Sequence, residues 1–534
     1  MKILVTDEID HEGVALLRST PDLVVDVVPT LPPGELMARI GDYDAIIGRS
    51  ATRISDDLLR AGKRLKVVGR AGVGVDNVAM DTATSLGIAV INAPAGNTIA
   101  VAELFFGTVI TLLRHLDRAG SSMRAGRWDR SSLKGSELKG RTLGIVGLGR
   151  IGGEVAHRAL AFGMDVVAND PYIPAERFTS LRVRRAETLD QLLPHVDIVT
   201  VHTPLTDETR GLLDRGRLEL LRDGGIVVNM ARGGIVDDAA LVDQLSSGRL
   251  GGAVLDVYQK EPLVGQHPLR GMDNVVLTPH IGASTREAQR NVAVDVCAAV
   301  RDALLRQDYS RSLNAALAGE DAEAIRPAMR LARAAATVAR ALLADGGHAV
   351  LDTLTLRAGG ELSGAGQALL AAASLGALEH VMGSDRVNLI NAPGLATSRG
   401  IALAMVSSSE PPHSRALEVR LQADGNEVRV GGIAPADAPP RITRIGAFHV
   451  DVLPKGTLLV MTNRDVPGVI GRVGTLLGEA GVNIAEYHQA RLSQGGDALA
   501  VITLDGPLPS GTREQLLGLP DVHSAMVVSL SSDR

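Results

Sequence analysis

Gly147-Leu148-Gly149-Arg150-Ile151-Gly152 is the stretch that decides the fold of this 534-residue chain. It has the GxGxxG spacing of a dinucleotide-binding turn and lies between a β-branched run, Thr142–Val146, and a helical run, Glu154–Phe162. The first glycine permits the tight turn, the second lets a pyrophosphate approach the backbone, and the third lets the helix pack closely on the strand. The helix begins with free amide groups and the positive end of its dipole, which suit phosphates.

An acidic residue at the expected distance strengthens this interpretation. Asp170 follows Gly147 by 23 residues, at the end of the next predicted strand, where a carboxylate accepts hydrogen bonds from an adenosine ribose. The same carboxylate repels a 2′-phosphate, so NAD is favoured over NADP. A glycine-rich turn without a ligand is the alternative, which the strand, helix and acid disfavour. Arg70–Gly74 also follows a predicted strand but lacks the later spacing, so Gly72 and Gly74 predict close backbone approach to a small ligand.

Short β-branched runs alternate with helical segments through the first half of the chain, which is typical of parallel sheets covered by helices. The first unit is predicted from the strands Lys2–Thr6, Ala45–Gly48, Leu65–Gly69 and Ala89–Ile91. The second unit is predicted from the strands Thr142–Gly147, Asp165–Asn169, Asp197–His202, Gly225–Asn229, Ala253–Val257 and Val275–Thr278. We therefore expect an α/β fold in which two doubly wound parallel-sheet domains enclose a cleft.

The composition changes near Asn314, where alanine and arginine become frequent. Beyond it we expect helices over Ile325–Leu343 and Ala365–Gly376, a β-like run over Glu418–Gly432 and a loop over Ala434–Pro440. The tail from about Gly456 shows the order strand, helix, strand, strand, helix, strand, which is that of a ferredoxin-like domain. An α+β intervening domain followed by a ferredoxin-like domain is therefore predicted.

Length and composition limit the classes of function. At 534 residues the chain exceeds one hydrophobic core, so three or four domains are expected. Aromatic residues make up only 2% and the net charge is −6, which disfavours nucleic-acid partners and an anionic membrane surface. The lone cysteine, Cys297, excludes a disulfide framework, and the segment Met1–Asp10 does not resemble a signal peptide. We expect a protein of the cytoplasm that holds no metal.

Three later segments supply the groups that hydride transfer from an alcohol requires, namely a base for the hydroxyl proton and a cation for the carboxylate. These segments are Asn229–Gly234, Asp256–Pro262 and Thr278–Thr285, each at the end of a predicted strand. Each of these residues, taken singly, also has an interpretation without function. Arg232 could be a surface charge, Glu261 could simply precede a turn proline, and His280 could cap a helix. Behind a dinucleotide-binding motif, and in this order, they predict an active site.

In these motifs residues 1–316 resemble the D-isomer-specific 2-hydroxyacid dehydrogenases. The resemblance implies that Arg232 binds the substrate carboxylate, that His280 is the acid/base, and that Glu261 hydrogen-bonds His280 and favours its protonated form. His202 is a rival base, for which a structural role is preferred. The cofactor contacts that the resemblance and the glycine turn imply are Gly147, Gly149, Arg150, Ile151, Gly152, Asp170, Thr203, Met230, Ala231, Arg232, Asp256, His280, Gly282 and Ala283.

A substrate with a phosphate group needs several cations, preferably guanidinium groups. Arg49 with Ser50, and Arg70 with Gly72 and Gly74, lie in RSAT and GRAGxGVDN motifs like those of the branch of the family that oxidises 3-phosphoglycerate. That branch also has a segment like Gly126–Arg130, whose second arginine reaches the phosphate site of a partner subunit. We therefore expect 3-phosphoglycerate as substrate, NAD as cofactor, a homo-oligomer, and Arg130 as a substrate contact across a dimer.

The C-terminal third resembles two modules of the long members of this branch. Residues 317–450 resemble an allosteric substrate-binding domain, with Arg444 and Lys455 as basic candidates for an anion site. Residues 455–534 resemble an ACT domain, which implies L-serine as an effector that contacts Asn463, Asp465 and Asn483. An assembly module without a ligand is the alternative.

The expected domains are therefore as follows: 1–97 and 285–316 for substrate, 98–284 for NAD as a Rossmann domain, 317–450 as the intervening domain and 455–534 as the ACT domain. The first of these is expected to be flavodoxin-like. Two other functions stay open at this point. One is a hydroxypyruvate or glyoxylate reductase, and the other is a non-enzymatic protein of the same fold that senses NADH.

Overall fold

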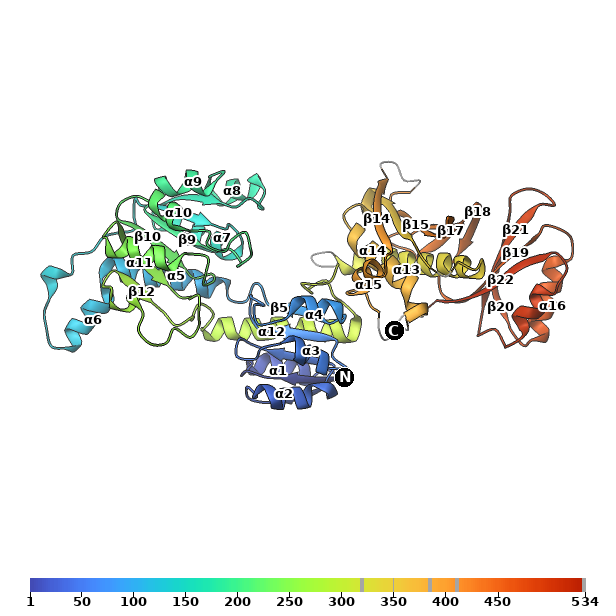
Figure 1. Cartoon of the computed structure of the whole chain (residues 1–534), viewed down its shortest axis with the longest axis horizontal. Helices are drawn as coiled ribbons and strands as arrows, with labels where there is room; N and C mark the ends of the chain where they lie inside the picture. Colours follow the sequence, from blue (N-terminus) through green and yellow to red (C-terminus); the bar gives the residue numbers. More distant parts are fainter. Residues whose placement is uncertain (317–320, 349, 383–386, 409–412, 531–534) are drawn as a thin grey trace.

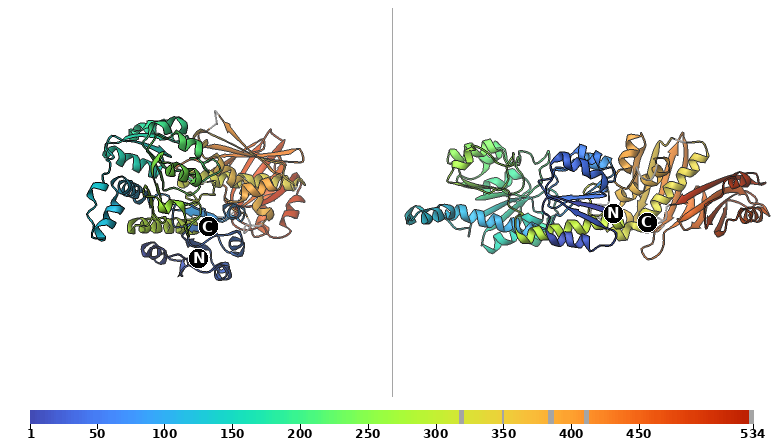
Figure 2. Two further views of the ribbon diagram at one scale, coloured as in Figure 1. Left: turned by 60° about the vertical axis from the view of Figure 1, so that its left-hand side comes forward. Right: turned by 90° about the horizontal axis from the view of Figure 1, so that it is seen from below.

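The computed structural model describes residues 1–316, 321–348, 350–382, 387–408 and 413–530. Four sheets follow one another along an elongated molecule (Figures 1 and 2). The unit built on the glycine turn lies at one end, the N-terminal unit comes next, and the two C-terminal units extend from it. The expected fold class, two doubly wound α/β units followed by an α+β unit and a ferredoxin-like unit, is confirmed.

The N-terminal unit is a five-stranded parallel sheet with the order β2-β1-β3-β4-β5, the flavodoxin-like order. Its strands are β1 (Lys2–Val5), β2 (Val24–Val27), β3 (Ala45–Gly48), β4 (Val67–Arg70) and β5 (Ala89–Asn92). Its helices are α1 (His11–Arg18), α2 (Pro33–Arg39), α3 (Asp56–Ala61) and α4 (Met80–Ser85). The later helix α12 (Arg286–Arg306) returns to pack on this unit, so Val296 and Ile47 share one core.

The second unit is a seven-stranded parallel sheet with the order β12-β11-β10-β9-β6-β7-β8, the Rossmann order with an added strand. Its strands are β6 (Thr142–Val146), β7 (Asp165–Asn169), β8 (Arg184–Arg185), β9 (Ile198–Val201), β10 (Gly225–Asn229), β11 (Leu250–Leu255) and β12 (Val275–Leu277). Its helices are α5 (Thr98–Arg114), α6 (Leu116–Arg124), α7 (Arg150–Ala161), α8 (Ala175–Leu181), α9 (Leu189–Leu192), α10 (Arg215–Leu220) and α11 (Asp238–Ser246). The glycine turn joins β6 to α7, beside β9, where the strand order reverses.

No single helix in the described ranges is long and apolar enough to cross a membrane. The bent pair α5 and α6, which meet at 66°, reaches the required length and composition only when the two are taken together.

The intervening unit has a six-stranded sheet with the order β14-β13-β15-β16-β17-β18. Its helices are α13 (Ala322–Asp345), α14 (Gly366–Met382) and α15 (Ala392–Ser398). Its strands are β13 (Thr353–Gly359), β14 (Ala402–Ser408), β15 (Ala416–Ala423), β16 (Asn426–Ile433), β17 (Arg441–Ile445) and β18 (Phe448–Val452). The run predicted over Glu418–Gly432 is a hairpin rather than one strand, because Asp424 and Gly425 turn the chain at positive φ.

The terminal unit has the antiparallel order β20-β21-β19-β22 of a ferredoxin-like fold. It consists of β19 (Gly456–Arg464), α16 (Val469–Glu479), β20 (Ile484–Arg491), β21 (Asp497–Leu504), α17 (Thr512–Leu517) and β22 (Val522–Leu530). Its two faces have different partners, since Leu459 packs under the unit's own helices while Leu458 and Val460 join the core of the intervening unit around α13. The two C-terminal units are therefore joined by one hydrophobic core, and the terminal unit has a second core of its own.

Candidate active site

A cleft of about 560 Å³ lies between the first two units, at the carboxyl ends of their strands. Of the residues proposed from sequence for catalysis or substrate binding, the cleft is lined by Arg49, Ser50, Arg70, Gly72, Gly74, Arg232, Glu261 and His280. Of the first five, Arg49 and Ser50 follow β3, while Arg70 ends β4 and the two glycines follow it; the last three come from loops after β10, β11 and β12. The parallel topology thus brings together residues that are up to 231 positions apart (280 − 49).

His280 and Glu261 form a close polar contact in the cleft. The Nδ1 atom of His280 lies 2.7 Å from Oε2 of Glu261. The other carboxylate oxygen of Glu261 accepts the backbone N–H of Tyr258 at 3.0 Å, which fixes the orientation of the carboxylate. Because an anionic partner stabilises an imidazolium, this pair can hold a proton that the Nε2 atom of His280 receives.

A buried carboxylate supports the loop that carries His280. Asp256 is 1% exposed. It accepts the hydroxyl of Thr278 at 2.6 Å and the backbone N–H groups of Ile281 and Gly282 at 2.8 Å each. The family resemblance implies that Asp256 contacts the cofactor. In the structure the carboxylate of Asp256 is hydrogen-bonded to residues on both sides of His280. This support could not be derived from the sequence, since it depends on the approach of two strand ends.

The guanidinium of Arg232 is oriented from both units. Its Nε donates to Asp76 of the first unit at 2.9 Å, and an NH group donates to the carbonyl of Ala231 at 2.7 Å. A Cβ atom on Gly74 would lie 1.6 Å from this guanidinium. Asp76 was not singled out from the sequence, because nothing local relates it to an arginine 156 residues away.

The glycines of the first unit make room for arginine side chains. A Cβ atom on Gly72 would lie 1.4 Å from the guanidinium of Arg70, just as one on Gly74 would meet Arg232. The expected close approach of the backbone to a ligand is thus in the structure a close approach of the backbone to cations. Any larger residue at either position would displace a guanidinium from the cleft.

Three arginines, Arg49, Arg70 and Arg232, lie close enough together in the cleft to repel one another. Burial and the neighbouring charges of Arg232 and Arg49 lower the pKa of Arg70 to about 10. One NH group of Arg70 donates to the Ser50 hydroxyl at 3.1 Å, while its buried Nε has no hydrogen-bond partner. An anion bound between these guanidinium groups would offset their mutual repulsion and could use the unpaired N–H of Arg70.

The glycine turn has the shape that a dinucleotide requires. Gly147 has φ +94°, and a Cβ atom there would lie 2.7 Å from the carbonyl oxygen of His202. A Cβ atom on Gly152 would lie 2.1 Å from the carbonyl oxygen of Gly147, whereas one on Gly149 would meet open space. The turn is therefore closed on its inner side and free on the side where a pyrophosphate approaches.

The polar groups around the turn also suit NAD. Asp170 accepts the backbone N–H groups of Leu148 at 2.8 Å and Tyr172 at 3.0 Å, which holds its carboxylate beside the turn. The buried hydroxyl oxygen of Thr203 has no hydrogen-bond partner. Arg150 and Ile151 begin α7, Met230 and Ala231 follow β10, and Gly282 and Ala283 follow β12. The proposed cofactor contacts thus lie beyond the carboxyl ends of β6, β7, β9, β10, β11 and β12.

The position of His202 does not suit a catalytic base, because its imidazole is buried outside the cleft. Its Nε2 lies 3.0 Å from the hydroxyl of Thr200 and its ring faces Phe105 edge-on. Burial lowers the pKa of His202 to about 4, so the imidazole is neutral at physiological pH. It does not line the cleft. A structural role is therefore favoured, as the sequence argument preferred.

Arg130 lies away from the cleft of its own chain. It begins a short turn, Arg130–Ser132, on the arm that projects beyond α6 (Figure 1). Trp128 on this arm is 79% exposed. Within one chain the structure does not bring Arg130 to the substrate-binding residues, so its predicted contact requires a second chain.

The proposed effector residues lie at opposite ends of the terminal sheet. Arg464, next to Asn463, pairs with Asp497, whereas Thr457 at the other end of β19 pairs with Leu504. Asn483 lies at that second end and donates to Asp505. A single terminal unit therefore does not bring these residues together.

Two contacts bear on the effector prediction. Asp465 accepts Arg491 at 2.9 Å, and this hydrogen bond holds the pKa of Asp465 below its usual range. The buried Oδ1 of Asn463 has no partner. An effector ammonium at Asp465 would have to compete with Arg491, whereas Asn463 has an unused acceptor.

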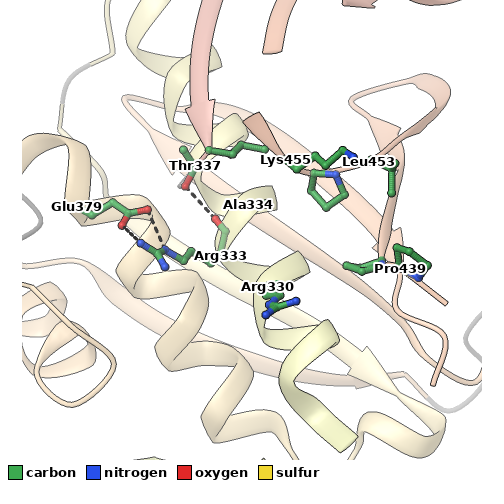
Figure 3. Close-up of a pocket in the computed structure, with 11 residues that line it drawn as sticks. Arg330, Arg333, Ala334, Thr337, Glu379, Pro439, Leu453 and Lys455 are labelled. Carbon is green, nitrogen blue, oxygen red and sulfur yellow. Dashed lines mark hydrogen bonds and ion pairs between the residues drawn. The ribbon is translucent and has the colours of Figure 1, made fainter. Parts of the chain in front are cut away.

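A second cavity of about 200 Å³ lies where the two C-terminal units meet (Figure 3). Arg330 and Arg333 of α13 line one side, and Lys455, just before β19, lines the other. Arg333 is paired with the buried Glu379 of α14. Of the two basic candidates named from the sequence, Lys455 lines this cavity and Arg444 does not.

Comparisons with known proteins place this architecture in a class. Residues 106–282 match the family model described as "D-isomer specific 2-hydroxyacid dehydrogenase, NAD binding domain". A D-lactate dehydrogenase from Aquifex aeolicus, solved with NAD and lactic acid, is 28% identical, has a TM-score of 0.51 and covers 58% of this chain with 98% of its own. The TT0316 protein of Thermus thermophilus is 36% identical, with a TM-score of 0.54 over 59% of this chain and 100% of its own. Fold and site thus define an NAD-dependent oxidoreductase.

Full-length relatives give the narrower family. D-3-phosphoglycerate dehydrogenases from Synechocystis and Bacillus subtilis are 38% and 36% identical over 99% of this chain, and cover 95% and 99% of their own lengths. The protein of that name from Methanocaldococcus jannaschii is 35% identical over 99% of this chain and 100% of its own. The chain belongs to the D-3-phosphoglycerate dehydrogenase family.

Proposed function

We propose that the protein oxidises 3-phospho-D-glycerate to 3-phosphohydroxypyruvate with NAD as acceptor, the first step of L-serine biosynthesis. The observation that carries this proposal is the cluster of Arg49, Arg70 and Arg232 in one cleft beside the His280–Glu261 pair. A substrate with a carboxylate and a phosphate matches such a cluster, whereas lactate or glyoxylate would leave at least one guanidinium without an anion.

The charged side chains of the cleft that were predicted from the sequence each have a role in the proposed reaction. Arg232, oriented by Asp76, binds the carboxylate of the substrate, while Arg49 and Arg70 bind its phosphate. The Nε2 atom of His280 takes the hydroxyl proton, and Glu261 stabilises the imidazolium that results. Gly147, Gly149 and Gly152 shape the turn that would hold the pyrophosphate of NAD, and Asp170 would hold its ribose. NAD bound there would supply the hydride acceptor for carbon 2 of the substrate.

The assay that tests the function measures NADH formation from 3-phosphoglycerate, D-glycerate and D-lactate in parallel. We expect kcat/KM for 3-phosphoglycerate to exceed that for the other two, because only this substrate engages the whole arginine cluster. Equal activity on all three, or preferred reduction of hydroxypyruvate or glyoxylate, would instead favour a general 2-hydroxyacid reductase. NADH binding without turnover of any substrate would favour a sensor.

Replacing Arg70 by alanine should lower kcat/KM for 3-phosphoglycerate about 10- to 100-fold, the effect of losing hydrogen bonds to a charged group. The activity on D-glycerate, which has no phosphate, should fall by less than threefold. Arg60→Ala, on the outside of α3, is the matched control and should change neither value. An Arg70→Ala protein with undiminished preference for 3-phosphoglycerate would show that this arginine does not bind the phosphate.

The domains divide this work as the sequence suggests. Residues 1–97 and 285–316 form the substrate-binding domain, and 98–284 form the NAD-binding domain, which also supplies Arg232, Glu261 and His280 to the substrate. The units at 317–450 and 455–534 regulate. The protein acts as a homo-oligomer in which the arm around Trp128 packs on a second chain, so that Arg130 reaches the phosphate site of its partner. It acts in the cytoplasm, a reducing compartment that suits its single buried cysteine, Cys297.

L-serine is the proposed effector of the terminal unit. Because Asn463 and Asn483 lie at opposite ends of one sheet, the serine site is formed between two terminal units, with the unpaired Oδ1 of Asn463 available to the ligand. L-serine at millimolar concentration should slow NADH formation, and D-serine should not. Titration calorimetry of the full chain checks binding directly. Neither heat nor inhibition from L-serine would leave the terminal unit as an assembly module only.

A further inference from the structure

The loop Asn388–Asn391, which leads into α15, is braced by its own side chains. The Oδ1 of Asn388 accepts the backbone N–H of Ile390 at 2.9 Å, and the Oδ1 of Asn391 accepts that of Asn388 at 2.8 Å. These bonds lie within the intervening unit and need no other part of the chain. The loop therefore presents a preformed tip to whatever it contacts.

This tip is inserted into the N-terminal unit. The Nδ2 of Asn388 donates to the carbonyl of Gly87 at 2.8 Å, a contact between residues 301 positions apart. Ile390 is 6% exposed and belongs to the same hydrophobic core as Ile91 of β5. A Cβ atom on Gly87 would lie 2.5 Å from Asn388 and 2.9 Å from Asn391, and the φ of +72° also favours glycine.

The docked segment leads into β5, and the far end of β5 contacts a loop that lines the cleft. Gly87 precedes β5, which pairs with β4 so that Asn92 lies opposite Arg70. At that end of β5 the backbone N–H of Ala93 donates to the carbonyl of Gly72 at 2.9 Å, and the Asn92 side chain donates to the carbonyl of Val73. The intervening unit thus contacts the chain just before this four-residue strand, and the far end of the strand, at Asn92, is hydrogen-bonded to the loop over Gly72 and Val73.

We propose that the Asn388–Asn391 loop is a positioning element for the substrate site, and that it acts through Gly87, β5 and Asn92 on the Arg70–Gly74 loop. This inference rests on the proposed function, because the loop it positions is the one assigned to the phosphate of 3-phosphoglycerate. The loop also connects the cleft to the core that the two C-terminal units share around α13. It leads into α15, which packs on α14, and α14 packs on α13. A shift of the tip would change the place of Arg70 without touching the glycine turn of the cofactor site.

Gly87→Ala tests the proposal, because its methyl group would displace the docked tip. We expect the KM for 3-phosphoglycerate to rise about tenfold, with kcat changed less than threefold and the Kd for NADH unchanged, since misplacement of binding groups by fractions of an ångström weakens substrate binding. Hydrogen–deuterium exchange should accelerate about tenfold in the peptide over residues 67–74 and stay constant over residues 142–152.

Two other substitutions serve as matched controls. Gly248→Ala has the same backbone strain, with φ +75°, but its Cβ would meet nothing, and Gly394→Ala adds an unopposed methyl group to α15 itself. Neither should alter KM or exchange. If Gly87→Ala does not fold, Asn388→Ala adds no atom but removes the hydrogen bond to Gly87 together with the ones that brace the loop at Ile390 and Asn391, and the same changes are expected.

A folded Gly87→Ala or Asn388→Ala protein with native KM and native exchange over 67–74 would overturn the proposal. Changes of equal size in KM and in the Kd for NADH would also overturn it, because they would show general loosening. Exchange does not depend on the substrate, so a wild-type protein inactive on 3-phosphoglycerate would refute the proposed function while exchange still decides the positioning role.

Discussion

The His280→Asn protein should oxidise 3-phosphoglycerate with a kcat lowered about 10²- to 10⁴-fold, the usual contribution of a general acid or base. Asparagine preserves polarity and approximate size but cannot take up a proton. The structure supports this size of effect because His280 is bonded to Glu261 at 2.7 Å, and no other histidine lines the cleft in the ranges that the structure describes. Stopped-flow measurement of NADH formation separates the chemical step from release of products.

The binding of NADH should survive this substitution, with a Kd within about threefold of the wild-type value. His523→Asn on the exposed side of β22 is the matched control and should leave kcat unchanged. Glu261→Gln should lower kcat less than His280→Asn does, because the imidazole remains but loses its anionic partner. A kcat for His280→Asn within fivefold of wild type would transfer the role of base to another group.

Local patterns predicted most of the first two sheets. The predicted strand over Ala45–Gly48 coincides with β3, because strands buried on both faces of a parallel sheet are nearly continuous apolar runs. The strand β2 was missed, since Asp26 interrupts it and its ends are exposed, which removes the apolar run that marks its neighbours. The turn at Asp424–Gly425 was visible in the sequence as a turn signal but was included in one run.

The site could be predicted only in part for a physical reason. The family resemblance and the strand ends predicted the meeting of Arg232, Glu261 and His280, because parallel topology puts all carboxyl ends at one edge. The partners that orient these groups could not be predicted from spacing. Asp76 meets Arg232 only after the two units pack together, and Asn388 meets Gly87 across 301 residues. Such contacts depend on the relative placement of domains, which no local pattern encodes.

Replacing Arg232 by glutamine should lower kcat/KM for 3-phosphoglycerate about 10²- to 10³-fold, as expected when a charged partner of a desolvated carboxylate is lost. Both kcat and KM should change, because the guanidinium binds the substrate and also orients carbon 2 for transfer of the hydride. Arg232→Lys should recover only part of the loss. A lysine keeps the charge but has no planar fork, so it cannot give a carboxylate two parallel hydrogen bonds while a separate N–H group at a fixed angle donates to Asp76.

Arg215→Gln, which breaks the exposed ion pair with Asp243, is the control for loss of a positive charge and should leave kcat/KM unchanged. Asp76→Asn separates orientation from charge, because Arg232 stays cationic but loses its anionic partner; its expected effect is about tenfold and therefore smaller. If Arg232→Gln affected D-lactate and 3-phosphoglycerate differently, Arg232 would be a phosphate ligand. Equal loss on both substrates is the result that the carboxylate assignment requires, because the carboxylate is the group that the two substrates share.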